Sequence, residues 1–250
     1  MTPVGIFVAT RWERQALLSA LPPAERRMVA GIACEVIRQP NQEWWVVPMG
    51  VGPARATATA KALCAQHAFR LIVSAGFACA LDHAAVGDVL IGTDVVLRED
   101  ERAKHETPCD LTVAEEVALA GRQAGLPVHC GRFVTVPTVL CRAAEKLAVA
   151  RQEKGIGLDM ESAALGAVAR EHRIPFTIVR TVSDLLEEDL PLDFNLFLRP
   201  SGWLAGIAAC VTRPSCLIGL NRLRRQSREA GRHLTAVYRA WAGLSAGRRA

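Results

Sequence analysis

The run Phe176-Thr177-Ile178-Val179-Arg180-Thr181-Val182 is apolar or β-branched at almost every position, and Ser183 and Asp184 follow it directly. A short continuous run of this kind is typical of a strand that is buried on both faces of a sheet. Arg180 is the charged residue within the run, and its role stays open from the sequence. The run therefore predicts a central strand that ends in polar side chains.

Further strand and helix patterns alternate with this run along the chain. Apolar runs predict strands over residues 4–9, 44–49, 71–76, 89–96 and 128–136. Helical spacing predicts helices over residues 12–21, 53–67, 112–124, 142–151 and 161–172. Alternation of this kind predicts an α/β fold, in which a mostly parallel sheet is covered by helices on both faces.

The composition limits the class of protein. With 250 residues, of which half are hydrophobic, the chain can bury a substantial core. It has no long apolar run free of charges and helix breakers, and residues 4–9 are typical of a buried strand, so we expect neither a transmembrane helix nor a signal peptide. The eight cysteines include no Cys-x-x-Cys pattern, so we expect no metal site, no disulfide framework and a cytoplasmic location.

The charge is distributed unevenly. Residues 199–250 hold ten Arg and one Glu, a formal charge of +9, whereas the rest of the chain has a formal charge of −4. The composition also changes near residues 198–202. We therefore expect an α/β catalytic domain over residues 1–198 and an amphipathic, basic helical extension over residues 199–250.

The extension carries one apolar stripe at alternating spacings of three and four residues, which predicts a helix. The stripe consists of Leu220, Leu223, Ser227, Ala230, Leu234, Val237 and Trp241. Because arginines lie off the stripe, residues 203–241 are a candidate segment for contact with a membrane surface. A helix that packs on the body with solvated arginines is the alternative. We expect no nucleic-acid binding, because base-stacking aromatic residues and a known motif are lacking.

Polar residues follow several of the predicted strands. Glu13 follows the first strand, Ser183 and Asp184 follow the last, and Met160 and Glu161 open a helix after a short apolar run. Ligands of α/β sheets bind at the carboxyl ends of the strands. These residues therefore predict one shared cleft, although acids at helix starts also act as caps and dipole partners.

Four segments, in this order, resemble the methylthioadenosine/S-adenosylhomocysteine nucleosidases and their nucleoside phosphorylase relatives. They are Ile6-Phe7-Val8-Ala9-Thr10-Arg11-Trp12-Glu13, Gly50-Val51-Gly52-Pro53, Leu158-Asp159-Met160-Glu161-Ser162-Ala163-Ala164 and Val179-Arg180-Thr181-Val182-Ser183-Asp184. The match covers residues 4–198. The resemblance implies a three-layer phosphorylase-type fold with a mixed, mostly parallel sheet between helices. It also implies a nucleoside substrate, a homodimer, and neither a cofactor nor a metal.

The resemblance further implies that the chain cuts the N-glycosidic bond of a 5′-substituted adenosine. Asp184 would act as general acid toward the adenine base, and Glu13 would orient and deprotonate the attacking water. Glu161 would bind the ribose hydroxyls and stabilise the cationic transition state, with Met160 packed against the sugar. The remaining substrate-binding candidates are Gly76, Phe77, Val139, Leu140 and Ser183.

Two departures from the family pattern affect the predicted reaction. The turn at residues 75–80 lacks the hydroxyl that phosphorylases use for phosphate, which favours water as nucleophile. Arg11 and Arg14 beside Glu13 favour phosphate instead, since Arg suits that anion. Val139 stands where the family has a purine-stacking aromatic ring, so we expect a more aliphatic contact with the base.

The basic extension resembles the hopanoid-associated nucleosidases, which are implied to remove adenine from the lipid nucleoside adenosylhopane. That resemblance implies a role in hopanoid biosynthesis and a peripheral position on the inner face of the cytoplasmic membrane. Three alternatives remain open: a phosphorolytic enzyme, a methylthioadenosine/S-adenosylhomocysteine nucleosidase, and a non-catalytic nucleoside-binding protein at the membrane. The retained carboxylates Glu13, Glu161 and Asp184 argue against the last of these.

Overall fold

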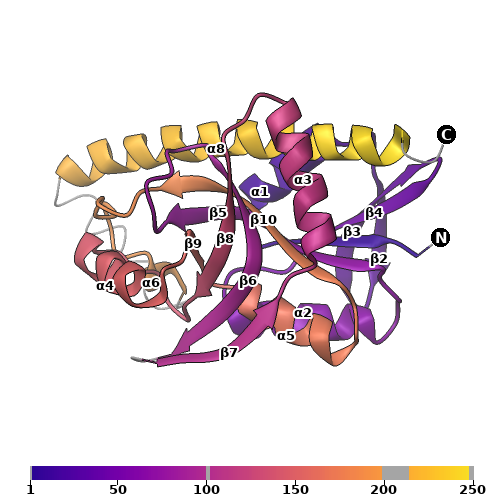
Figure 1. The fold of residues 1–250 in the computed structure, drawn as a ribbon, viewed down its shortest axis with the longest axis horizontal. Coiled ribbons are helices and arrows are strands. Elements are labelled where there is room, and N and C mark those ends of the chain that lie inside the picture. The colour runs from indigo at the N-terminus through magenta and orange to yellow at the C-terminus, as the bar shows by residue number, and fades with distance from the viewer. Residues whose placement is uncertain (1, 100–101, 199–213, 248–250) are drawn as a thin grey trace.

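A computed structural model describes residues 2–99, 102–198 and 214–247. Within these residues one sheet of ten strands is packed between helices (Figure 1). The strands are β1 (Val4–Val8), β2 (Glu25–Val29), β3 (Ile32–Gln39), β4 (Gln42–Pro48), β5 (Leu71–Ala80), β6 (Val89–Glu99), β7 (Arg102–Pro108), β8 (Val128–Thr135), β9 (Gly157–Asp159) and β10 (Phe176–Asp184). The helices are α1 (Arg11–Ala20), α2 (Pro53–Cys64), α3 (Leu111–Gln123), α4 (Ala143–Glu153), α5 (Ser162–Glu171), α6 (Asn195–Leu198) and α8 (Pro214–Gly247).

The sheet is mixed and closes on itself. Its order is β10-β6-β8-β9-β5-β1-β4-β3-β2, and β10 also pairs with β5, so that five strands form a ring. The adjacent strands β4, β1, β5 and β10 run parallel to one another, whereas β6 runs antiparallel to β10. These observations confirm the predicted α/β fold. They also bring the carboxyl ends of β1, β5 and β10 to the same edge, where polar side chains gather.

Each buried strand contributes side chains to two hydrophobic cores, because successive side chains point to opposite faces of the sheet. In β1, Ile6 and Val8 join the cluster under α1, α3 and α8, whereas Phe7 joins the cluster under α2 and α5. In β5, Val73 belongs to the first cluster and Ile72 to the second. Figure 1 shows α1, α3 and α8 on one side of the sheet and α2 and α5 on the other. The near-continuous apolar runs in the sequence follow from this double burial.

Four strands were not predicted from the sequence: β2, β3, β7 and the three-residue β9. In β2 four of the five residues are exposed, and β3 pairs with it at the end of the sheet order. Strand β7 carries Arg102, Lys104, His105 and Glu106. Charged residues are typical of edge strands, and they hide the apolar pattern on which strand prediction depends. The backbone ladder with β3 and β6 defines these strands instead.

Part of the apolar stripe predicted for the C-terminal segment forms the face of helix α8 that packs against the sheet. Leu234, Val237 and Trp241 are buried, and the Trp241 ring lies 4.8 Å from the Trp44 ring in an edge-to-face contact. Thr181 Oγ1 of β10 donates a hydrogen bond of 3.0 Å to the Ala230 carbonyl. This part of the stripe is therefore unavailable to a membrane, which corrects our interpretation of it as a membrane-contacting face.

Two expectations about the C-terminal segment lie partly outside the described residues. The candidate membrane segment of residues 203–241 begins within residues 199–213, and the expected boundary between residues 198 and 199 lies at their edge. The division into two units therefore stays a prediction. In the part of the chain that the structure describes, no helix is both long enough and apolar enough to span a membrane.

Candidate active site

A cavity of about 170 Å³ lies at the carboxyl ends of β5 and β10. Eight of the nine residues predicted for the site line it: Glu13, Phe77, Val139, Leu140, Met160, Glu161, Ser183 and Asp184. Gly76, the ninth, lies directly beside Glu13. The structure thus brings together side chains that are up to 171 positions apart in the sequence (Glu13 to Asp184). The roles assigned to them stay predictions.

Glu13 is held by backbone N–H groups from two segments. Thr10 and Glu13 form a capping box at the start of α1, in which Glu13 Oε2 accepts bonds of 2.7 Å from Thr10 N and 3.0 Å from Ala9 N. Glu13 Oε1 accepts a bond of 2.8 Å from Phe77 N in β5. A carboxylate has about four acceptor positions, so one remains for a bound water. Glu13 is therefore both a helix cap and a cavity residue.

Gly76 allows this carboxylate to approach β5 closely. Its φ is +147°, and a Cβ placed on it would overlap Glu13 Oε1. A glycine is required here for space as well as for backbone conformation. Gly76 thus acts through the position of Glu13.

Glu161 is almost completely buried at the start of α5. Its Oε1 accepts a bond of 2.9 Å from Gly52 N, which the glycine turn after β4 presents with a φ of +99°. Arg180 Nη2 lies 3.4 Å from Glu161 Oε2. Burial raises the pKa of Glu161 to about 7, with Arg180 opposing the shift and Asp159 adding to it. Glu161 therefore titrates close to neutral pH.

Arg180, whose role was open from the sequence, forms the hydrogen bonds and ion pairs that connect the segments around this site. Its Nε lies 2.8 Å from Asp159 Oδ2, and its Nη1 donates a bond of 2.8 Å to the Phe77 carbonyl. Its Nη2 donates a bond of 2.9 Å to Ser74 Oγ, which also accepts from Ser162. Arg180 is 1% exposed and lies in β10, which pairs with β5 and β6. It joins β5, β9 and α5 around Glu161.

Asp184 ends β10 and contacts a buried ammonium group. Lys146 of α4 donates a bond of 2.8 Å to Asp184 Oδ2, and Ser183 Oγ donates one of 3.0 Å to Asp184 Oδ1. Lys146 also donates to the carbonyls of Leu185 and Glu188, each at 3.1 Å. Burial lowers the pKa of Lys146, but the Asp184 carboxylate and the neighbouring Cys79 together more than offset this and raise it above its ordinary value. Lys146 stays charged and fixes Asp184 in place.

The segment that carries Val139 is clamped to the start of α6. Asn195 Oδ1 accepts a bond of 2.9 Å from Val139 N, and Asn195 Nδ2 donates one of 2.9 Å to the Val139 carbonyl. Val139 and Leu140 then offer aliphatic surface to the cavity, as expected from the absence of an aromatic ring there.

Arg11 and Arg14 do not line this cavity. Arg14 forms an ion pair with Glu35 of β3, and its Nε lies 3.0 Å from Glu35 Oε2. The Arg11 guanidinium lies over the Trp12 ring, 4.9 Å from its centroid. The sequence argument that these arginines favour phosphate is therefore not supported by their positions.

Two residues at the site were not singled out from the sequence: Lys146 and Asp159. Lys146 lies in a helical segment where a single lysine carries no signal, and its partner Asp184 is 38 positions away. Asp159 was visible only as part of the motif around Glu161. In the described residues, no group of three or more His, Cys, Asp or Glu side chains is placed to hold a metal ion.

The fold and the cavity define a class of α/β protein in which carboxylates from strand and helix ends surround one small cleft. A model of the phosphorylase superfamily matches residues 3–199, and the chain belongs to this superfamily.

Two proteins with similar sequences are named as nucleosidases. The 5′-methylthioadenosine/S-adenosylhomocysteine nucleosidase of Shewanella loihica is 23% identical over 214 residues, which is 80% of this chain and 93% of that protein. The protein with the same name from Staphylococcus haemolyticus is also 23% identical, over 78% of this chain and 92% of that protein.

Solved structures share the fold at low identity. The Neisseria meningitidis 5′-methylthioadenosine/S-adenosylhomocysteine nucleosidase in complex with methylthio-immucillin-A has a TM-score of 0.70 and 15% identity, covering 96% of this chain and 99% of that chain. A futalosine hydrolase variant from Helicobacter pylori has a TM-score of 0.67 and 16% identity, covering 90% of this chain and 99% of that chain.

Proposed function

We propose that this chain is a purine nucleosidase, which hydrolyses the N-glycosidic bond of a 5′-substituted adenosine and releases adenine. The observation that carries the proposal is the placement of Glu13, Glu161 and Asp184 around one cavity. The names of the similar proteins from Shewanella loihica and Staphylococcus haemolyticus support the same chemistry.

Asp184 is proposed as the general acid. Its protonated form donates a proton to the purine N7 while the glycosidic bond breaks, so that adenine leaves as a neutral base. The carboxylate that remains is then stabilised by Lys146 and Ser183, which both donate to it. Val139 and Leu140 supply apolar contact with the base.

Glu161 and Glu13 are proposed to act on the sugar side. As the base leaves, positive charge develops on the ribosyl ring, and ionised Glu161 stabilises it while accepting bonds from the ribose hydroxyls. The free acceptor position of Glu13 holds a water, and Glu13 takes its proton as the water attacks the sugar carbon. Met160 packs against the sugar.

Water is favoured over phosphate as the nucleophile. Residues 75 and 77, next to Glu13, are Ala and Phe and offer no hydroxyl. Arg14 is engaged by Glu35, so neither it nor Arg11 presents a cation to the cavity. A phosphorolytic reaction is the alternative.

The 5′ substituent is the second part of the proposal. The names of the similar proteins favour a methylthio or homocysteinyl thioether, whereas the resemblance of the C-terminal segment to hopanoid-associated nucleosidases favours adenosylhopane. These two substrate hypotheses can be tested by chromatography of the adenine that the purified protein releases. The substrates are adenosine, methylthioadenosine, S-adenosylhomocysteine and adenosylhopane. Release from methylthioadenosine but never from adenosylhopane would contradict the lipid substrate, and release from none would contradict the nucleosidase.

A homodimer and a peripheral position on the inner face of the cytoplasmic membrane remain proposals that depend on the resemblance. Deleting residues 199–250 is an unsuitable test, because α8 contributes Leu234 and Trp241 to the core. The variant Arg222→Glu/Arg225→Glu instead changes the charge of an exposed part of α8. Weaker sedimentation with anionic liposomes would support membrane contact, and unchanged sedimentation would contradict it. Light scattering measures the oligomer directly.

A further inference from the structure

The base side of the catalytic cavity is held by a residue that the proposed reaction does not use. Residues 139–141, which we call the base segment, follow β8, and Val139 and Leu140 of this segment line the cavity. Asn195 is the first residue of α6 and contacts the base segment from outside the cavity. Its side chain is therefore placed to hold the base segment without touching a ligand.

The Asn195 side chain binds both backbone polar groups of Val139. Its Oδ1 accepts a bond of 2.9 Å from Val139 N, and its Nδ2 donates one of 2.9 Å to the Val139 carbonyl. This contact needs one donor and one acceptor at the end of a short side chain, which asparagine provides. An ionised aspartate has the same size but offers acceptors only.

The orientation of this amide is fixed by a neighbouring carboxylate. Asp193 Oδ1 accepts bonds of 3.0 Å from Asn195 Nδ2 and from Asn195 N. The amide nitrogen thus faces two acceptors, Asp193 Oδ1 and the Val139 carbonyl, and the amide oxygen faces the Val139 N–H. An amide turned by 180° would place its oxygen against both acceptors, so the hydrogen bonds define a single orientation.

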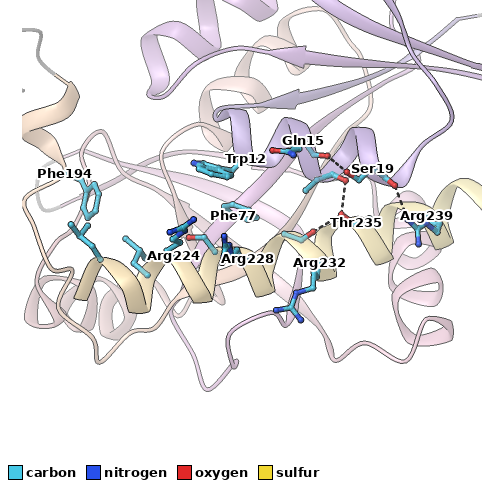
Figure 2. Close-up of a pocket in the computed structure, with 15 residues that line it drawn as sticks. Trp12, Gln15, Ser19, Phe77, Phe194, Arg224, Arg228, Arg232, Thr235 and Arg239 are labelled. Carbon is cyan, nitrogen blue, oxygen red and sulfur yellow. Dashed lines mark hydrogen bonds between the residues drawn. The ribbon is translucent and has the colours of Figure 1, made fainter. Parts of the chain in front are cut away.

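The residue before Asn195 faces a different space. Phe194 lines a groove of about 670 Å³ between α1 and α8, together with Leu220 and Leu223 of α8. Figure 2 shows Phe194 beside the first turns of α8. Two neighbouring side chains at the start of α6 therefore have separate surroundings: the Phe194 ring is at the groove, and the Asn195 amide is at the base segment.

A second hydrogen bond holds the other end of the base segment. Leu190 N donates a bond of 2.8 Å to the Cys141 carbonyl. Val139 and Cys141 flank Leu140, so the backbone on both sides of this cavity residue is held by the chain that follows β10. Because β10 ends in Asp184, the proposed general acid and the supports of the base segment belong to one continuous stretch of chain.

We propose that Asn195 is a positioning residue for the adenine base, and that it acts through the backbone of Val139. The proposal rests on the nucleosidase function proposed above, in which Val139 and Leu140 contact the base. Asn195 does not touch the substrate; it holds the surface against which the base lies. It therefore sets the affinity for the base and leaves the sugar side, at Glu13 and Glu161, unchanged.

Two substitutions of Asn195 and one matched control test this role. Asn195→Asp preserves the size of the side chain but places acceptors against the Val139 carbonyl and the Asp193 carboxylate, so the two-point contact is lost. Asn195→Leu removes both bonds without adding a charge. Asn221→Asp makes the first exchange on an exposed side chain of α8 that lines neither cavity.

The experiment measures product inhibition during turnover of the substrate from the panel above that the unchanged protein cleaves fastest. Adenine as inhibitor reports on the base side, and 5-methylthioribose reports on the sugar side. Both Asn195 variants should raise the inhibition constant of adenine by about tenfold, the effect of two lost hydrogen bonds. The constant for methylthioribose should stay within about twofold, which also shows that the variants are folded. Asn221→Asp should change neither constant.

The outcomes separate this role from the proposed function. Unchanged inhibition by adenine in both Asn195 variants would contradict the positioning role and leave the nucleosidase intact. An equal rise of both inhibition constants would contradict it as well, because such a rise indicates that the whole cavity has loosened. No turnover of any substrate in the panel by the unchanged protein would contradict the nucleosidase itself.

Discussion

Lys146 Nζ lies 2.8 Å from Asp184 Oδ2, and the lysine side chain is 1% exposed. All three ammonium hydrogens have acceptors, since the carbonyls of Leu185 and Glu188 take the other two. A buried charge pair with such complete hydrogen bonding fixes the position of both partners. The general acid proposed here is thus held by a residue from α4, a helix that the sequence did not connect with the site.

Lys146 and Asp184 should be energetically coupled, so that their substitutions change the free energy of unfolding non-additively. Lys146→Met leaves the Asp184 carboxylate without its counter-charge, which we expect to lower the free energy of unfolding by about 3 kcal/mol. The double variant Lys146→Met/Asp184→Asn removes that uncompensated charge and should recover at least about 1 kcal/mol. Urea unfolding of the four proteins measures both values. Strictly additive effects would show that the pair is not coupled.

Asp184→Asn should abolish most of the activity while it preserves the fold. The amide keeps the size of the side chain but cannot donate a carboxylic proton, so kcat for adenine release should fall by about 10² to 10⁴. Asp82→Asn, on an exposed side chain away from the cavity, is the matched control and should change nothing. Steady-state adenine release measures the effect. A kcat close to that of the unchanged protein would remove Asp184 from the mechanism.

Glu161 should set the acidic limb of the pH profile. Its pKa is raised to about 7, and its ionised form stabilises the ribosyl cation. As the pH rises toward 7, kcat/KM should therefore rise with the ionisation of Glu161, and it should fall at higher pH, where Asp184 lacks the proton that it must donate. Glu161→Gln should lower the maximum by about 10² and remove this limb. A profile that keeps its limb near pH 7 in Glu161→Gln would assign the titration to another group.

The same pKa has a consequence for stability. Because the folded protein holds the Glu161 proton more tightly than the unfolded chain does, this group stabilises the fold most below about pH 4.5. That contribution is lost as the pH rises from about 4.5 to about 7. Glu161→Gln should abolish this pH dependence, so the unfolding free energy of the unchanged protein should fall relative to that of the variant as the pH rises through this window. A constant difference across the window would contradict the raised pKa.

Gly76→Ala should reduce activity through Glu13. The added Cβ would overlap Glu13 Oε1, and the φ of +147° is unfavourable for alanine. We expect kcat/KM to fall by about tenfold or more, since small displacements of catalytic groups cost as much. Gly243→Ala in α8, with open space around its Cβ, is the control. Full activity of Gly76→Ala would show that the approach of Glu13 to β5 is dispensable.

The sequence predicted the parts of the site that short local motifs encode. Asp184 ends β10, Glu13 and Glu161 lie within five residues after β1 and β9, and strand ends of an α/β sheet converge on one edge. Lys146 and the ion pairs of Arg180 depend on contacts between segments that are distant in the sequence. The spacing of apolar residues carries no information about such contacts. The fold class was predicted from buried strands, whereas the exposed strand β2 and the charged strand β7 were missed because they lack an apolar pattern.

Helix α8 shows a second limit of the sequence. The apolar stripe from Leu220 to Trp241 was identified, but the period of a helix does not say which surface the stripe meets. In the structure Leu234 and Trp241 face the sheet, whereas Leu220 and Leu223 line the groove beside α1. One periodic pattern therefore serves two surfaces, and only the packing of α8 on β10 and α1 distinguishes them.

The central claim is that water cuts the N-glycosidic bond within the cavity of Glu13, Glu161 and Asp184. Its most direct test is turnover of 5′-methylthioadenosine in water enriched in oxygen-18, with and without phosphate, followed by mass spectrometry of the sugar. Our account predicts adenine and a free sugar that carries the heavy oxygen, at a rate independent of phosphate. A phosphate-dependent rate with an unlabelled sugar 1-phosphate, or no adenine at all, would contradict it.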